Sequence, residues 1–204
     1  MDVNFIEASA LANIDRNIQN NSSVSAAQYE IIRQVIYSTA DFEYSSLLKF
    51  TNQPLFRGYQ ALTSGVPIVV DVPEIQVSIV PKLQQTFYNP VYCCATTGTQ
   101  SSRTKTRAAF GLESLASQHS NSILLIGQDR TTLEVALDLA KKGVINPSLA
   151  IATAPLFTEQ DFKQYLKSAP FPTIYIDSFK GGAMVAAAIF NGLVNLAWRV
   201  NNYQ

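Results

Sequence analysis

Short apolar runs alternate along this chain with segments of helical periodicity, and this alternation constrains the fold more than any other feature. The runs PIVVDV at 67–72 and SILLI at 122–126 are rich in β-branched and other apolar residues without regular polar positions. Strands of this kind are expected in a parallel sheet that is covered on both faces. Together with the helical segments between them, they predict an α/β fold in which a mostly parallel sheet lies between two layers of helices.

The predicted elements cover most of the chain after a short polar turn at 20–23. Ser25 is suited to cap the first helix, and Gly65 and Gly143 stand just past the ends of two others. Strands are expected at 67–72, 91–95, 122–126, 148–153 and 173–176. Helices are expected at 25–38, 54–64, 104–118, 131–142, 159–168 and 183–200. With 204 residues, no internal repeat and no linker, residues 1–204 are predicted to form a single domain.

The charge balance limits the partners of this chain. It holds 15 Lys and Arg residues against 15 Asp and Glu residues, so its formal net charge is +0. Such a chain has no overall field to hold nucleic acid or an anionic membrane. No apolar run approaches the roughly 20 residues that cross a bilayer, and the first residues lack the basic start of a signal peptide. We therefore expect a cytoplasmic protein that binds neither nucleic acid nor membranes.

Residues that serve most often in metal binding and proton transfer are scarce. The only two cysteines, Cys93 and Cys94, are adjacent and fall short of a four-ligand zinc site, so buried strand positions are expected for them. The only histidine, His119, lies near a predicted helix end, where it can satisfy the last carbonyl groups. We expect a function that does not depend on a catalytic histidine.

Ligands of open parallel sheets bind beyond the carboxyl ends of the strands, where loops lead into helices. The loops that follow residues 72, 126 and 176 occupy such positions. In the third loop Lys180 precedes Gly181 and Gly182, a cation beside exposed backbone N–H groups that could hold an anion. The alternative is that the two glycines only allow a tight turn and close helix packing. No GxxxxGK[ST] or GxGxxG motif supports a nucleotide site.

Two further groups of charged residues are candidates for a binding site. Three basic residues at 103–107 open a predicted helix and could hold carboxylates through their arginines, or they could form a solvated helix face. On the first predicted helix, Arg33 and Tyr37 are four residues apart on one face, and Asp41 follows the helix end. This row could be a site, or a helix-end salt bridge beside a packed tyrosine.

Five short motifs extend in a fixed order over most of the chain. They are RQVIYSTAD at 33–41, GVPIVVD at 65–71, TRAA at 106–109, IGQDRTTL at 126–133, and KGGA at 180–183 with NGL at 191–193. Each motif alone is weak. Taken together and in this order, they resemble the precorrin-8X methylmutases, the isomerases of cobalamin biosynthesis.

The resemblance implies a homodimeric α/β protein that binds precorrin-8X or a related corrin macrocycle near the subunit interface. The family reaction moves a methyl group between adjacent carbons of ring C, gives a hydrogenobyrinate- or cobyrinate-type product, and needs no metal or organic cofactor. The position of Tyr37 is then the catalytic one. By the same resemblance, the residues that contact the substrate, among them its acetate and propionate groups, are Arg33, Asp71, Thr106, Arg107, Lys180, Gly181 and Gly182.

The chain departs from the family pattern at this expected site. The family's catalytic histidine is replaced by Tyr37, its Asn-Ala-Pro loop by the residues at 128–130, a serine by Ala183, and a Gly-x-Pro-Val-Gly-Phe stretch by ATAPLF at 152–157. A phenol has a pKa of about 10 against about 6.5 for imidazole, so full proton donation would be harder by about 5 kcal/mol. A phenol still donates hydrogen bonds, and this is the role expected of Tyr37.

Two functions of different classes follow from these residues. The favoured one is an active methylmutase in which Tyr37 donates a hydrogen bond to the macrocycle. The other is a non-catalytic tetrapyrrole-binding paralogue that holds or hands on a corrinoid intermediate, which the replaced loop residues suggest. A third reading is an α/β protein that binds neither ligand.

Overall fold

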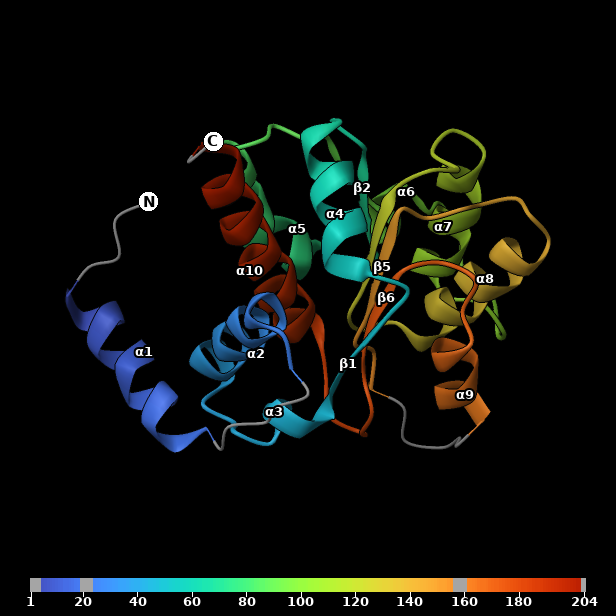
Figure 1. The fold of residues 1–204 in the computed structure, drawn as a ribbon. Coiled ribbons are helices and arrows are strands. Elements are labelled where there is room, and N and C mark those ends of the chain that lie inside the picture. Colours follow the sequence, from blue (N-terminus) through green and yellow to red (C-terminus); the bar gives the residue numbers. More distant parts are fainter. Residues whose placement is uncertain (1–4, 19–23, 156–160, 203–204) are drawn as a thin grey trace.

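The computed structural model describes residues 5–18, 24–155 and 161–202 (Figure 1). Within these ranges, six strands form one sheet in the order β1-β6-β5-β4-β2-β3. β1 is antiparallel to β6, and all other neighbouring strands are parallel, so the predicted mostly parallel sheet is confirmed. The strands are β1 (Leu48–Thr51), β2 (Ile68–Val70), β3 (Val91–Cys93), β4 (Ile123–Ile126), β5 (Leu149–Ala152) and β6 (Thr173–Ile176).

Helices cover both faces of the sheet, which confirms the predicted three-layer arrangement (Figure 1). Successive strand residues enter two separate apolar cores, for example Leu125 in the first and Leu124 in the second. The helices that contribute most side chains to the first core are α2 (Ala26–Thr39), α4 (Pro54–Thr63), α5 (Pro73–Leu83) and α10 (Ala183–Asn202), and two further helices each add one buried residue, Ile14 and Tyr44. Those of the second are α7 (Arg107–Ala116), α8 (Arg130–Lys141) and α9 (Asp161–Lys167). The remaining helices are α1 (Phe5–Asn17), α3 (Tyr44–Leu47) and α6 (Cys94–Thr97).

Local signals explain where several helices begin. The Ser25 hydroxyl accepts a hydrogen bond from the Gln28 backbone N–H at 3.2 Å, and the Gln28 side chain accepts one from the Ser25 N–H at 2.9 Å. This capping box satisfies two N–H groups that the first turn leaves without helical partners. The helix predicted from residue 104 begins three residues later, because the Ser102 hydroxyl accepts from the N–H groups of Thr104 and Lys105 and holds a turn there.

α10 is the central helix of the first core. It is long and apolar enough to cross a membrane by length and composition, but 56% of that apolar window is buried within the described structure. It packs along α2 and α5, and Phe190 lies fully buried between them and the sheet. This burial is that of a core helix.

Truncating Phe190 is expected to destabilise the protein. Phe190→Ala removes a fully buried ring, and such changes cost about 3–5 kcal/mol because a cavity remains. The matched control is Val77→Ala on α5, because Val77 is 69% exposed and such surface changes stay within about 0.5 kcal/mol. Denaturant unfolding measures both, and equal losses for the two variants would contradict this assignment of the core.

Candidate functional site

The candidate site lies where the loops that follow β2, β4, β5 and β6 meet at one edge of the sheet. β2 and β4 are neighbours, yet the chain runs from β2 outward to β3 and from β4 in the opposite direction to β5. In open α/β sheets, ligands bind in the crevice at such a reversal, outside the carboxyl ends of the strands. Two of the three loops named from the sequence, those after β2 and β4, flank this reversal.

Asp71 lies beneath the loops on both sides of the reversal. It is 1% exposed, and its Oδ2 accepts hydrogen bonds from the backbone N–H groups of Gln128 at 2.8 Å and Asp129 at 2.7 Å. Within the described residues, Oδ1 has no hydrogen-bond partner. Burial raises the pKa of this carboxyl above its usual value, and the backbone N–H groups oppose that rise. The structure places the Oδ2 of Asp71 against the β4–α8 loop, and the predicted contact of Asp71 with the substrate stays a prediction.

Asp129 joins that loop to the start of α7. Its carboxylate accepts from the Thr131 N–H at 3.0 Å and from the Thr132 hydroxyl at 2.7 Å, so it caps α8. The Thr106 hydroxyl also donates to this carboxylate and accepts from the Ala109 N–H at 3.2 Å as the cap of α7. The sequence prediction treated Asp129 only as a departure from a family pattern. Its place just before a helix was the signal for a cap.

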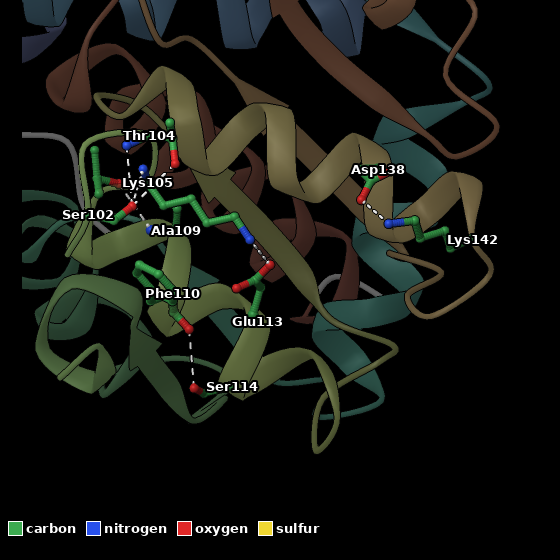
Figure 2. Close-up of polar contacts among 10 residues, drawn as sticks. Ser102, Thr104, Lys105, Ala109, Phe110, Glu113, Ser114, Asp138 and Lys142 are labelled. Carbon is green, nitrogen blue, oxygen red and sulfur yellow. Dashed lines mark hydrogen bonds and ion pairs between the residues drawn. The ribbon is translucent and has the colours of Figure 1, made fainter. Parts of the chain in front are cut away.

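The basic residues at 103–107 do not converge on one point. Lys105 reaches along α7 to Glu113 at 2.5 Å and lies 5.5 Å from the centre of the Phe110 ring (Figure 2). The Arg107 Nε donates to the carbonyl of Gly98 at 2.5 Å, which fixes the side chain at the start of α7. Arg107 therefore stays at the carboxyl ends of the strands, which we call the carboxyl edge of the sheet. Lys105 instead forms an ion pair on the surface of α7.

Lys180, in the β6–α10 loop, is held by two carboxylates of the α2–α3 connection. Its ammonium lies 2.6 Å from Asp41 Oδ2 and 2.9 Å from Glu43 Oε2. The hydrogen bond from Lys180 lowers the pKa of Asp41, and the hydrogen bond to Asp41 is the largest cause that raises the pKa of Lys180. Two negative groups on one cation leave a surplus negative charge. A ligand anion at Lys180 therefore competes with these two carboxylates for the ammonium.

Gly181 and Gly182 allow a close approach of two backbones. Their φ values are +152° and +117°, and a Cβ on Gly181 would lie 2.0 Å from the carbonyl oxygen of Thr153. The Gly182 N–H donates to the same carbonyl at 2.7 Å, and the Thr153 hydroxyl donates back to the Gly182 carbonyl at 3.0 Å. The two glycines therefore allow close backbone packing against Thr153, and the predicted anion site at this loop stays a prediction. A Cβ on Gly182 would meet only Gln128 Oε1, at 4.0 Å, so this residue borders open space.

The row of Arg33, Tyr37 and Asp41 divides between two places. Arg33 binds Asp15 of α1 at 3.1 Å and Glu30 at 2.7 Å, so the expected salt bridge at the helix end, within this row, is not formed. Asp41 binds Lys180 at the edge of the sheet. Tyr37 lies one helical turn before Asp41, is 41% exposed, and makes no hydrogen bond with any described residue. Its hydroxyl is available to a ligand.

The remaining predicted residues have structural surroundings. The His119 ring stacks on Tyr92 with centroids 4.2 Å apart, rather than capping the helix end. Cys93 and Cys94 are both buried and free, but only Cys93 lies in a strand as expected, because Cys94 begins α6. Burial raises the pKa of the Cys94 thiol well above its ordinary value. In the divergent stretch 152–157, residues 156 and 157 lie outside the described part of the chain.

The pH dependence of stability tests the state of Asp71. Because its folded pKa is raised, the folded state binds a proton more tightly than the unfolded chain, so this group loses stability as pH rises from its unfolded pKa toward its folded pKa. Asp71→Asn keeps an acceptor for the two N–H groups but does not titrate. We expect the unfolding free energy of Asp71→Asn to gain on the wild type as pH rises above about 4. A difference that is constant between acidic and neutral pH would contradict this.

The three layers and the loops gathered at the carboxyl ends of the strands define a doubly wound α/β protein with a candidate ligand site at the reversal of strand order. The model of one family, described as precorrin-8X methylmutase, matches residues 5–196. This chain therefore belongs to the precorrin-8X methylmutase family.

Individual relatives agree with this assignment. The cobalt-precorrin-8 methylmutase of Synechocystis sp. is 33% identical over 205 residues, which cover 93% of this chain and 94% of the relative. The cobalt-precorrin-8 methylmutase of Leptospira interrogans is 28% identical over 211 residues, which cover 92% of this chain and 96% of the relative. The solved structure of the precorrin-8X methyl mutase from Thermus thermophilus superposes with a TM-score of 0.86 over 96% of each chain. At 24% identity, this last likeness shows the shared fold.

Proposed function

We propose that this chain is a methylmutase of cobalamin biosynthesis that moves a methyl group between adjacent ring C carbons of a precorrin-8X-type macrocycle. The observation that carries the proposal is the family match over residues 5–196, which contains every segment of the carboxyl edge described above. The reaction is an intramolecular isomerisation, so the atoms of substrate and product balance without a co-reactant.

Tyr37 is the proposed hydrogen-bond donor to the macrocycle. Its exposed hydroxyl has no partner among the described residues and lies within one turn of the Asp41–Lys180 ion pair. A phenol placed there can stabilise charge that develops on the ring while the methyl group migrates. In this proposal Tyr37 acts by donating a hydrogen bond.

The substrate's carboxylates have two proposed places at this edge. Arg107 offers a guanidinium whose Nε is already directed by Gly98, and the Gly182 region borders open space beside Gln128. Lys180 is available only when a substrate carboxylate replaces Asp41 or Glu43. Asp71, Thr106 and Gly181 act in this proposal by holding the loops, and Arg33 acts by holding α2 against α1.

The remaining expectations are part of the same proposal. The chain would act in the cytoplasm as one domain and as a homodimer, without nucleic acid or a membrane as partner. Its neutral formal charge supports the absence of nucleic acid. The names of the Synechocystis and Leptospira relatives support a substrate that carries cobalt in its macrocycle. The metal would then be part of the substrate and would have no binding site of its own on the protein.

Matched assays with metal-free precorrin-8X and with cobalt-precorrin-8 test this function. The wild-type protein is expected to convert the cobalt form to the rearranged product. The conversion is observed as a change of the absorption spectrum and as a new chromatographic peak with the same mass as the substrate. Tight binding of the product without any conversion would instead favour the non-catalytic tetrapyrrole-binding paralogue. Absence of any spectral change with either compound would exclude both.

A further inference from the structure

A cavity lies at the amino ends of the strands, on the opposite side of the sheet from the loops that carry Asp129 and Lys180. It has a volume of about 760 Å³ and is bordered by α4 and by the loops that precede β4, β5 and β6. Cavities of a few hundred to about 1,000 Å³ are typical of small-molecule sites. The side chains that line it are Asn52, Arg57, Gln60, Ala61, Ser64, Val66, Ser120, Asn121, Asn146, Pro147, Ser148, Pro170 and Pro172.

One face of α4 forms a wall of this cavity. Arg57, Gln60, Ala61 and Ser64 recur at helical spacing and share that face. Within the residues that the structure describes, the Arg57 guanidinium has neither an ion-pair nor a hydrogen-bond partner. Among the described side chains that line the cavity, none is a carboxylate. Arg57 therefore supplies an uncompensated positive charge.

The other walls are held in place by hydrogen bonds between loops. The Asn146 N–H donates to the Ser120 carbonyl at 2.8 Å, and the Ser148 hydroxyl donates to Asn121 Oδ1 at 2.6 Å. The amide of Asn52 donates to the carbonyls of Ala169 and Phe171 at 3.0 and 3.2 Å. These contacts leave the donor group of the Asn121 amide free to face a ligand.

Backbone strain marks the entry into α4. Asn52 and Gln53 both adopt the left-handed region, with φ of +58° and +55°. Such conformations are unfavourable for residues other than glycine, and they concentrate at functional sites. Here the two residues place Asn52 on the loop before β6 and orient the first turn of α4, which carries Arg57.

We propose that this amino-edge cavity binds a small polyhydroxylated organic anion. Its oxyanion group, a phosphate or a carboxylate, would pair with the Arg57 guanidinium, whose planar set of donors fits either one. Its hydroxyl groups would bind the amide and serine side chains of the walls. The inference does not depend on the methylmutase activity, since it uses none of the residues at the carboxyl edge.

Calorimetric titration of the full chain with four probes tests the proposal: glucose 6-phosphate, gluconate, glucose and inorganic phosphate. Glucose 6-phosphate or gluconate is expected to bind more tightly than both glucose and inorganic phosphate. Arg57→Gln is expected to weaken that binding about tenfold or more, because a charged hydrogen-bond pair is lost. Arg103→Gln, which removes an exposed arginine elsewhere, is the matched control and is expected to leave the affinity unchanged.

A second variant guards against a folding defect in Arg57→Gln. Gln60→Ala keeps the cation and changes an exposed residue on the same face of α4. It is expected to weaken binding of the sugar anion while leaving the response to inorganic phosphate unchanged. Lack of saturable binding by both sugar anions, or an equal loss in Arg57→Gln and Arg103→Gln, would overturn the proposal.

Discussion

The Tyr37→Phe variant is expected to convert cobalt-precorrin-8 at least about 100-fold more slowly than the wild type, since loss of one donor to developing charge costs about 10²–10³ in rate. The change removes only a hydroxyl that contacts no described residue, so stability and the affinity for the macrocycle should change little. The measurement is the initial rate at several substrate concentrations, which separates kcat from KM.

Two companion variants define what the Tyr37 result means. Tyr88→Phe removes the hydroxyl of a tyrosine that is 75% exposed, and its rate should equal that of the wild type. Tyr37→His introduces the histidine that the family resemblance predicts for this position, and it is expected to convert the substrate at least as fast as the wild type. Unchanged turnover in Tyr37→Phe would remove Tyr37 from the mechanism while leaving the family assignment intact.

Gly181→Ala is expected to produce the second large effect, a joint loss of stability and turnover. Its φ of +152° disfavours a side chain, and the added Cβ would lie 2.0 Å from the Thr153 carbonyl oxygen. Overpacking of this kind costs about 1–3 kcal/mol, in addition to backbone strain of about 1–3 kcal/mol. Relief of the clash must move the β6–α10 loop and with it Lys180.

Gly143→Ala is the matched control for Gly181→Ala. Gly143 also has a positive φ, +70°, but nothing lies within 4 Å of an added Cβ. This variant therefore reports the strain alone, and its turnover should stay normal because Gly143 follows α8 at the far end of that helix. If denaturant unfolding showed equal losses for both variants, close packing at Gly181 would not be the cause.

Within the described residues, the sequence predicted the strands β2 to β6, including the edge strand β3, but missed β1 and α5. β2, β4 and β5 are apolar on both faces, and such runs are distinctive. β1 was missed because its short stretch LKFT pairs only with β6, in an antiparallel sense, and carries a lysine. α5 was missed because it has prolines at its first position and in its interior. Proline inside a helix removes a hydrogen bond, so such a sequence does not predict a helix.

The candidate site was predictable in its loops but not in its contacts. The positions of strand ends located the turns around Gln128 and Lys180. The residues that contact those turns could not be predicted from the sequence, because Asp41 and Lys180 are 139 residues apart and Asp71 and Gln128 are 57 apart. Only the fold brings such pairs together. The local sequence could therefore predict that Lys180 binds an anionic ligand, but it could not show that Asp41 and Glu43 already bind its ammonium group.

The Lys180 ion pairs also shape what binding of the substrate requires. Asp41 and Glu43 compete with any ligand carboxylate for the same ammonium. Displacing them would free the α2–α3 connection and leave Tyr37 at the end of a less constrained helix. Binding at Lys180 and positioning of Tyr37 are thus coupled in the proposed function.

Incubation of the purified wild-type chain with cobalt-precorrin-8 tests the central claim most directly. The proposed methylmutase must turn over many substrate molecules per protein and release the rearranged corrinoid, identified by its absorption spectrum and by the position of the migrated methyl group in NMR. Stoichiometric binding with the methyl group still in its original position would contradict the claim.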